Sequence, residues 1–292
     1  MKPDFNKGLL LTSLGSFWWG FIGVIYFEYV SFIGHVELVV HRCLWTAIML
    51  IFTTTLFSKW KLFLTTSSNK SYLFYLFISG FLIFINWAIW IYAVATDRII
   101  DASFGYFIMP IISVLLGYIF FRENLNRKRT FSILLVFISI IILIFFNLKD
   151  LPWVGLIVAL SWAFYNLVRK KINVDTDIGL LIESLYILPF AIITFYFISK
   201  NGLNDFSFSN IELSLLLILA GPMTVIPLFL YVRGVELIGL GPTGMIFYIT
   251  PTLQFILGYF YYNEEFSLVK FLSFVIIWIA VIIYLKDLYE NN

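Results

Sequence analysis

The sequence predicts an all-α integral membrane protein with ten transmembrane helices, arranged as two inverted five-helix repeats. Of its 292 residues, 61% are hydrophobic and only 12% are charged, whereas a soluble domain carries roughly 25% charged residues. Apolar runs of about 20 residues, the length that a bilayer-spanning helix needs, follow one another along the chain. In addition, two segments 141 residues apart align without a gap, which is typical of a membrane protein built from two similar halves.

The two aligned segments share an isoleucine, a proline, a Leu-Gly-Tyr triplet and a glutamate in the same order. The first copy has them at Ile108, Pro110, Leu116, Gly117, Tyr118 and Glu123, and the second at Ile249, Pro251, Leu257, Gly258, Tyr259 and Glu264. Because each half is predicted to hold an odd number of spans, we expect the copies to face opposite ways in the membrane. We expect both glutamates to lie at the surface, where they cap a helix or pair locally.

The ten predicted spans are separated by short connections. They cover approximately residues 8–28, 36–57, 71–95, 101–121, 130–147, 152–169, 178–199, 211–236, 241–262 and 267–286. The first run is too long for the apolar part of a signal peptide and no small-x-small cleavage site follows it, so we expect it to be retained. The longest polar stretches, 59–70 and 200–210, separate the second from the third run and the seventh from the eighth.

The sixth run resembles the first, which places the seam between the repeats before it. Gly155-Leu156 opens the sixth run as Gly8-Leu9 opens the first, and Phe164-Tyr165 then matches Phe17-Trp18. The seam near residues 150–152 divides the chain into a first repeat, 1–150, and a second repeat, 151–292.

The distribution of Lys and Arg predicts the orientation of the chain. With the N-terminus in the cytoplasm, 14 of the 19 Lys and Arg residues fall on the cytoplasmic side and 5 on the other. The sequence therefore predicts a multi-pass protein of the cell inner membrane with both termini in the cytoplasm.

Several classes of function are disfavoured by what the sequence lacks. No Gly-x-x-x-x-Gly-Lys-Ser/Thr loop is present, so ATP is not expected to drive the protein directly. His35, His41 and Cys43 are too few for a usual metal site, and no cofactor is predicted. The net charge is only +2 and no basic tract is interleaved with aromatic residues, so no nucleic-acid partner is expected.

Short motifs spread over nearly the whole chain carry a resemblance to a known family. They are His41-Arg42 with Trp45, Asn86-Trp87 with Ala93-Val94, Ala102-Ser103, Gly105-Tyr106-Phe107-Ile108, Pro110, Phe164-Tyr165, Leu167-Val168-Arg169-Lys170-Lys171-Ile172, Leu181-Ile182-Glu183, Leu188-Pro189, Pro227-Leu228, Tyr248-Ile249 and Pro251-Thr252-Leu253. At these spacings the chain resembles the RarD-type proteins of the EamA family, in the drug/metabolite transporter superfamily.

That resemblance implies ten helices around a central cavity and the movement of small metabolites, without implying one substrate. The chain departs from the usual pattern at two places. Met109 stands where RarD-like chains usually carry Asn, and Phe247 stands where they often carry Gln. Both departures replace a polar group that could face the cavity, so the substrates of relatives do not carry over directly.

Polar and aromatic residues within the spans are the candidate substrate path. They are Trp18, His41, Arg42, Asn86, Trp90, Tyr106, Tyr165, Asn166, Glu183, Tyr248 and Gln254. A charge at the centre of a bilayer costs about 3 kcal/mol or more, so such groups usually face protein or water. Arg42 aligns with Glu183 at the 141-residue offset, and the two either line the cavity as a charged pair or each snorkel and pair locally. Asn86 and Gln254 either face the cavity or link helices.

Three prolines are candidate hinges: Pro110, Pro227 and Pro251. Proline removes a helical hydrogen bond and kinks the helix. Pro110 and Pro251 occupy matching places in the two repeats, as alternating access would require, although a simple packing bend remains the alternative.

These observations favour a secondary transporter of a small organic metabolite or drug-like solute that works by alternating access. Its expected partners are that solute, a coupling proton as a candidate ion, and the lipid bilayer; the sequence specifies no oligomeric state. The alternative is a membrane-embedded enzyme that acts on a lipid or lipid-linked substrate, although the short loops offer no nucleophile and base for it. A membrane scaffold or sensor is a third possibility, but no soluble output domain is present.

Overall fold

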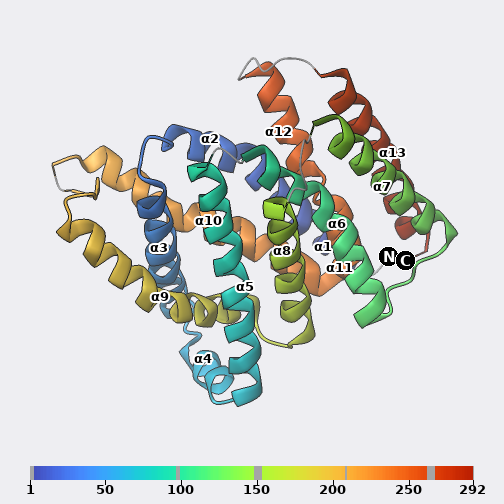
Figure 1. The fold of residues 1–292 in the computed structure, drawn as a ribbon. Helices are drawn as coiled ribbons and strands as arrows, with labels where there is room; N and C mark the ends of the chain where they lie inside the picture. The colour runs from blue at the N-terminus through green and yellow to red at the C-terminus, as the bar shows by residue number, and fades with distance from the viewer. Residues whose placement is uncertain (1–2, 97–98, 148–152, 208, 262–266, 292) are drawn as a thin grey trace.

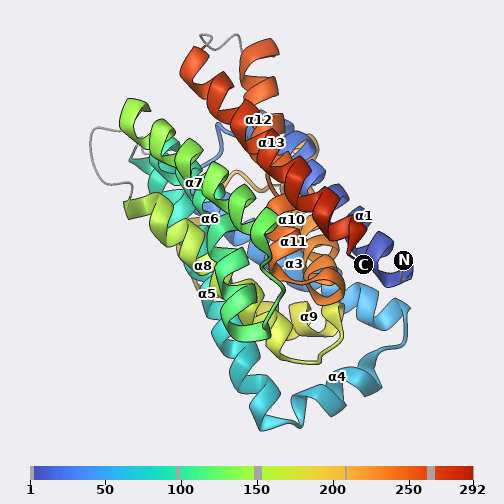
Figure 2. The same cartoon turned by 90° about the vertical axis from the view of Figure 1, so that its right-hand side faces the viewer.

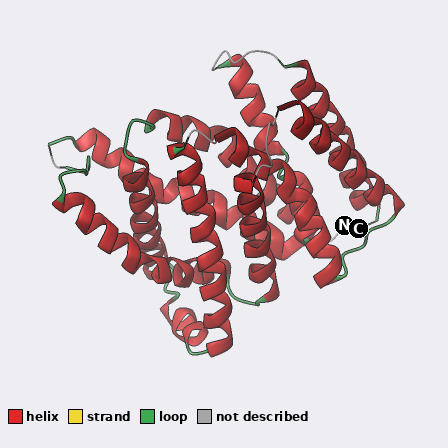
Figure 3. Cartoon of the chain, in the orientation of Figure 1, coloured by secondary structure: helices red, strands yellow, loops and turns green. Residues whose placement is uncertain are grey.

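The computed structural model describes residues 3–96, 99–147, 153–207, 209–261 and 267–291. Every regular element in these ranges is a helix (Figure 3). Eight helical segments among the described residues are long and apolar enough to cross a membrane. The helices are α1 (Pro3–Phe17), the π-helical turn η1 (Trp18–Ile22), α2 (Gly23–Tyr29), α3 (His35–Leu56), α4 (Trp60–Ser67), α5 (Lys70–Ala95), α6 (Ile99–Phe121), α7 (Arg127–Asn147), α8 (Trp153–Lys171), α9 (Thr176–Lys200), α10 (Ile211–Ile238), α11 (Leu240–Ile246), α12 (Ile249–Phe260) and α13 (Leu268–Glu290).

The predicted apolar runs coincide with helices, but two of them fall outside the eight long apolar segments. The sixth run forms α8, which ends in Arg169, Lys170 and Lys171 and is therefore less apolar than the others. The ninth run is broken at residues 247–248 into α11 and α12, of 7 and 12 residues, and neither piece alone reaches the length of a span. The polar stretch 59–70 holds a further short helix, α4. The predicted seam at 150–152 and Glu264 lie outside the described residues.

The first span contains a π-helical turn in its middle. α1, η1 and α2 follow one another without a break, and together they form one apolar segment over Asp4–Tyr29. A π turn inserts an extra residue into a helical turn and so rotates the side chains that follow. At Gly20 in this turn the backbone approaches α12 so closely that an added Cβ would lie 2.8 Å from the carbonyl oxygen of Thr250.

The helices pack in a pattern that mixes the two halves of the chain. α1 packs against α10, and α8 packs against both α5 and α6. α3 packs against both α9 and α10, α7 against α13, and α11 against α6. The pair α7 and α13 lies at one side of the bundle, and α4 protrudes at its lower end in the view of Figure 1 (Figures 1 and 2).

Large apolar side chains cover much of the outer surface. Phe145, Phe197 and Phe131 are 79%, 56% and 53% exposed. A water-soluble protein rarely exposes apolar patches of this kind. This surface, together with the eight long apolar helices, is that of a multi-pass membrane protein.

The two termini lie at the same end of the bundle. Asp4 and Phe5 from the N-terminus and Leu288 and Asn291 from the C-terminus line one surface depression together with Glu123. We call this the basal end and the opposite end, where α2 meets α3, the distal end.

Candidate functional site

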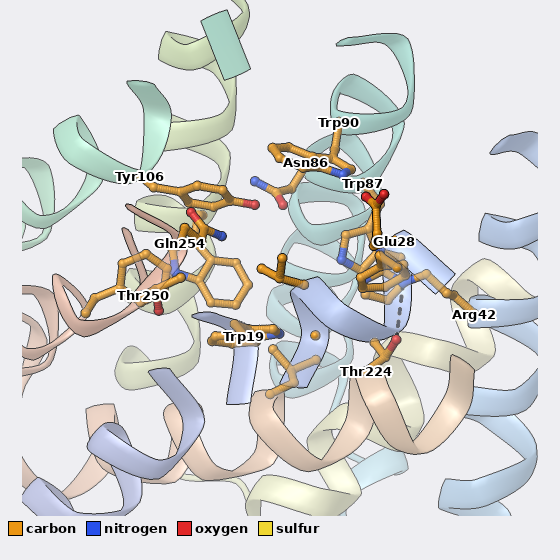
Figure 4. Close-up of a pocket in the computed structure, with 16 residues that line it drawn as sticks. Trp19, Glu28, Arg42, Asn86, Trp87, Trp90, Tyr106, Thr224, Thr250 and Gln254 are labelled. Atoms are coloured by element: carbon orange, nitrogen blue, oxygen red, sulfur yellow. Dashed lines mark hydrogen bonds between the residues drawn. The ribbon is translucent and has the colours of Figure 1, made fainter. Parts of the chain in front are cut away.

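A cavity of about 370 Å³ lies in the distal half of the bundle. It is lined by residues of η1, α2, α3, α5, α6, α8, α10 and α12, so both halves of the chain contribute to its wall (Figure 4). Its volume is at the lower end of the range for pockets that bind small organic molecules.

Much of the cavity wall is aromatic. Trp19, Trp87, Trp90, Tyr106, Trp162 and Phe247 all line it. The ring of Trp19 lies 5.2 Å from that of Trp162 and 6.1 Å from that of Phe247, measured between centroids. The ring of Tyr106 lies 5.6 Å from that of Trp90 and 5.9 Å from that of Phe247. These edge-on and tilted contacts are the arrangements that aromatic rings prefer, and they hold the wall rigid.

Arg42 is the cationic side chain of the wall. Its Nε donates a hydrogen bond to Oγ1 of Thr224 at 3.2 Å. Its guanidinium carbon lies 5.0 Å from the centroid of Phe27 and 4.8 Å from that of Trp87, so the planar group is held between two rings. Glu28 lines the same cavity and is exposed.

Two amide side chains also line the cavity. Asn86 uses its Nδ2 to donate to the carbonyl oxygen of Val158 and to Oγ of Ser161, each at 3.0 Å, and thereby links α5 to α8. The Asn86 amide and the Tyr106 hydroxyl point toward one another in Figure 4. Gln254 lies on the side of the cavity opposite Arg42 in the same view.

The break between α11 and α12 brings the equivalent positions of the two aligned segments into contact. The hydroxyl of Tyr248 donates to the carbonyl oxygen of Phe107 at 2.7 Å, and these two residues are 141 positions apart. Pro110, three residues further along α6, has no N–H to donate, so the regular helical ladder is already interrupted there. Thr250 adds a hydrogen bond of 2.9 Å to the carbonyl oxygen of Ser16, next to the π turn.

Glu183 lies in a separate buried cluster. It accepts hydrogen bonds from the hydroxyls of Ser79 and Tyr165. Its nearest cation is Arg169, whose Nη1 lies 3.6 Å from its Oε1. Arg169 also lies 3.8 Å from Glu236 and donates to the carbonyl oxygen of Thr176. The two aligned charges therefore do not form a pair with each other: Glu183 pairs locally with Arg169, whereas Arg42 lines the cavity.

The basal end is tied together across the two halves of the chain. Lys59 lies 3.2 Å from Asp175 and 2.8 Å from Asp177. Burial disfavours the charge of Lys59, but its hydrogen bond to Asp177 and the nearby negative charges outweigh this and raise its pKa. The charge of Lys59 is therefore present at neutral pH, and the tie is lost as the pH rises through that raised pKa.

A second basal tie is made by Glu123. It pairs with Lys170 at 2.9 Å and accepts hydrogen bonds from the backbone N–H groups of Leu240 and Gly241, both at 2.8 Å. It therefore caps α11, a helix of the other half, rather than the end of its own helix. A third tie joins Arg129 to Asp287 at 2.8 Å.

The cavity wall contains five of the eleven residues that the sequence predicted for the path: Arg42, Asn86, Trp90, Tyr106 and Gln254. The other six, Trp18, His41, Tyr165, Asn166, Glu183 and Tyr248, lie outside this wall. His41 packs against Phe206 and accepts a hydrogen bond from Nε1 of Trp45 at 3.2 Å. Asn166 donates to the carbonyl oxygen of Trp162 within α8.

The wall also contains residues that were not predicted from the sequence, among them Trp19, Glu28, Trp162 and Thr224. For Trp19 the missing signal was the π turn, which places Trp19 rather than Trp18 in the wall. Trp162 lies one helical turn before Asn166, on the same face of α8, so helical spacing could have indicated it. Among the described residues, no group of three His, Cys, Asp or Glu side chains is placed to hold a metal ion.

Comparisons with known proteins give a consistent match. The model of the EamA-like transporter family matches residues 6–145 and again residues 152–286. The protein RarD of Escherichia coli K12 is 32% identical over 97% of this chain and 95% of its own length. An uncharacterized transporter of Vibrio cholerae is 33% identical over 98% of this chain and 94% of its own length. A solved crystal structure shares the fold with a TM-score of 0.70 and 12% identity, over 96% of this chain and 97% of that one.

Proposed function

Because this chain belongs to the EamA-like transporter family, we propose that it is a secondary transporter that moves a small organic solute across the cytoplasmic membrane by alternating access. The family and the names of the relatives indicate a membrane transporter rather than an enzyme. The observation that carries the mechanism is the cavity between the two halves, which is placed in the distal half while ionic ties join the halves at the basal end.

The proposed architecture is ten spans in two inverted halves, with repeats at 1–150 and 151–292. The packing pattern supports it. The first three proposed spans are α1, α3 and α5, and their counterparts five spans later are α8, α9 and α10. If each span is exchanged for its counterpart, the contact of α1 with α10 becomes that of α8 with α5. The same exchange turns the contact of α3 with α10 into that of α9 with α5. The two separate matches of the family model support the same division.

The proposed orientation places the basal end in the cytoplasm, as the 14-to-5 distribution of Lys and Arg requires. The cavity is then accessible from outside, and Lys59, Glu123 and Arg129 make the cytoplasmic seal. To release solute inward, the seal must separate while the distal ends of the helices approach. Pro110, Pro227 and Pro251 are the proposed hinges, since the first two lie inside helices that line the cavity and Pro251 lies in the first turn of α12, next to the break.

The candidate coupling group is Glu183. It is buried between the two halves, with Ser79 from α5 on one side and Tyr165 and Arg169 from α8 on the other. A proton bound there would remove its attraction to Arg169 and so bias the packing of α8 against α9. Support for this role would be transport whose pH dependence disappears in Glu183→Gln.

The transport function is tested with purified protein in liposomes loaded with a small-molecule extract of cells. The solutes that leave are identified by mass spectrometry and compared with those that leave protein-free liposomes. We expect at least one organic solute to be lost faster through the protein. If no solute leaves faster than from protein-free liposomes, although the protein is folded and inserted, the proposal is wrong.

A matched pair of variants links flux to the cavity. Gly23 lines the cavity, and the nearest atom to an added Cβ there is a backbone oxygen of its own segment, at 3.3 Å. Gly34 lies between α2 and α3, where an added Cβ meets nothing within 4 Å. We expect Gly23→Phe to fill the cavity and abolish flux, and Gly34→Phe to leave flux unchanged. Equal flux through both variants would show that the solute does not pass through this cavity.

A further inference from the structure

Arg42 is a cation in the cavity wall that has no carboxylate partner among the residues that the structure describes. In the described part of the chain no Asp or Glu oxygen lies within 4.0 Å of its guanidinium, and its one hydrogen bond runs from Nε to Thr224. A guanidinium carries five N–H donors and stays protonated in proteins. The four N–H groups on its two η nitrogens therefore have no acceptor among the described residues.

The two buried arginines, Arg129 and Arg169, differ from Arg42, which is only partly buried. Arg129, 6% exposed, pairs with Asp287 at 2.8 Å. Arg169, 1% exposed, lies within 3.6 Å of Glu183 and 3.8 Å of Glu236. The chain thus supplies carboxylates to the arginines that lie in packed regions and stacks the one at the cavity between Phe27 and Trp87 instead.

An anion from outside the protein would stabilise a positive charge in this position. Charged groups within membrane spans are costly unless they are paired or reach water. The planar fork of an arginine matches the two oxygens of a carboxylate, and the paired hydrogen bonds are about twice as strong as neutral ones. Stacking between two rings fixes the fork in one orientation before a ligand arrives, which reduces the entropy lost on binding.

The remainder of the wall suits a flat apolar body. Trp19, Trp90 and Trp162 present ring faces and edges to the same space. Gln254, on the side opposite Arg42, makes no hydrogen bond to the described residues, so its amide is free to meet a neutral polar group (Figure 4). Glu28 is an acidic group on this wall, and it is exposed and beyond ion-pair distance of Arg42.

On the basis of the transport function above, we propose that the cavity binds small organic anions, with a carboxylate held by the fork of Arg42 and an aromatic body held among the tryptophans. Arg42 selects the charge of the solute, and the ring wall selects its shape. Glu28, at the exposed part of the wall, disfavours anions that carry a second negative charge.

The test compares three probes that share one ring system and differ in charge: indole-3-acetate, indole-3-acetamide and tryptamine. Equilibrium binding of each radiolabelled probe to the purified wild-type protein in detergent is measured by scintillation proximity. We expect indole-3-acetate to bind at least about tenfold more tightly than the amide, and tryptamine to bind most weakly. Equal affinities for the acid and the amide, or tighter binding of tryptamine, would show that Arg42 does not select an anion. These comparisons use wild-type protein, so they decide the matter even if a variant fails to fold.

Variants then assign the selectivity to Arg42. Arg42→Gln should reduce the affinity for indole-3-acetate to that of the amide, whereas Arg42→Lys should retain part of the preference for the acid. Arg127→Gln makes the same chemical change at an exposed site on α7 and should leave all three affinities unchanged. Glu28→Gln should leave the affinity for indole-3-acetate unchanged or raise it. If Arg42→Gln binds the acid as wild type does, the proposal is wrong.

Binding and flux separate this proposal from the transport function. Binding of indole-3-acetate through Arg42 without flux of any solute in liposomes would contradict transport and leave the anion site in place. Flux of solutes together with equal binding of acid and amide would contradict the anion site and leave transport in place.

Discussion

Arg42 and Glu183 lie 141 positions apart, at the offset of the two aligned segments, and have opposite environments. Arg42 faces the cavity between two aromatic rings, and Glu183 lies in a packed cluster with Ser79, Tyr165 and Arg169. The same backbone position thus faces the cavity in one half and lies between packed helices in the other. A charge that lies on a cavity can be changed with less effect on stability than one that lies in a packed cluster.

At the scale of single residues, we predict that Glu183→Gln destabilises the protein. The change leaves Arg169 buried, with Glu236 at 3.8 Å as its remaining carboxylate. Breaking a buried ion pair from one side costs about 3–5 kcal/mol, because the other charge stays buried. The measurement is the apparent melting temperature in detergent, with transport assayed below that temperature.

Glu212→Gln is the matched control, because Glu212 is exposed in the first turn of α10. Adding Arg169→Gln to Glu183→Gln should restore part of the lost stability, because no charge is then left unpaired. A melting temperature equal to that of wild type in the single variant would contradict the buried pair.

Single residues were harder to predict from sequence than spans. Trp18 was predicted for the path because it aligns with Tyr165, but Trp19 lines the cavity and Tyr165 belongs to the Glu183 cluster. The extra residue in a π turn depends on packing against α12 at Gly20, and no local pattern indicates it. Arg42 and Asn86 could be predicted, because a polar group inside an apolar run is informative wherever it occurs.

At the scale of the elements, the cavity is built where helices are irregular. The π turn η1 and the break between α11 and α12 lie beside each other, joined by Thr250 and Ser16. Pro110 interrupts α6 close to the point where Tyr248 reaches its backbone. Irregular helices leave backbone groups free and bend at low cost, so motion is expected to concentrate there.

We predict that Pro110→Ala and Pro251→Ala insert at normal levels and slow transport several-fold, because the first restores a helical hydrogen bond within α6 and the second removes the fixed backbone angle of proline in the first turn of α12. Initial rates of solute flux at matched protein density are the measurement. Pro189→Ala is the control, since Pro189 also lies inside a helix but is exposed and lines no part of the cavity. Normal rates in both hinge variants would show that the kinks are packing bends.

The elements themselves were largely predictable, because an apolar run of about 20 residues has few alternatives to a membrane helix. The break at residues 247–248 was not predicted. The run 241–262 is apolar throughout, and hydropathy does not distinguish one long helix from two short ones. The contacts beside the break are tertiary: the hydroxyl of Tyr248 bonds to the backbone of α6, and that of Thr250 bonds to the backbone of Ser16.

At the scale of the whole molecule, the ionic ties gather at one end and the cavity at the other. Lys59, Glu123 and Arg129, all from the first half, each pair with a residue of the second half. An arrangement of this kind holds two bodies closed at one end and leaves them separable at the other.

The orientation is the first prediction at this scale. In a Cys43→Ala background, Asn201→Cys should react with a membrane-impermeant maleimide in intact cells, and Ser68→Cys should react only after the membrane is opened. Both residues are exposed, and they lie in polar segments at opposite ends of the predicted topology. If Ser68→Cys alone is labelled in intact cells, the orientation is the opposite of the predicted one.

The second prediction concerns the basal ties. Lys59→Gln should weaken the seal and increase the population that is open at the cytoplasmic end. The reaction rate of Leu228→Cys, a cavity residue, with an impermeant maleimide in inside-out vesicles should rise several-fold. Lys286→Gln, at a 74% exposed side chain, is the control. An unchanged rate in Lys59→Gln would show that this tie does not hold the seal.

The tryptophans of the cavity wall give the protein a built-in optical probe. Four of its nine tryptophans, Trp19, Trp87, Trp90 and Trp162, line the cavity. Indole emission shifts to longer wavelengths in polar surroundings, so water entering the space and solute displacing it should move the spectrum in opposite directions. Replacing the partly exposed Trp60 and Trp153 with Phe would remove two emitters that lie outside the wall. Opening, loading and emptying of the cavity could then be followed in real time without attaching a dye.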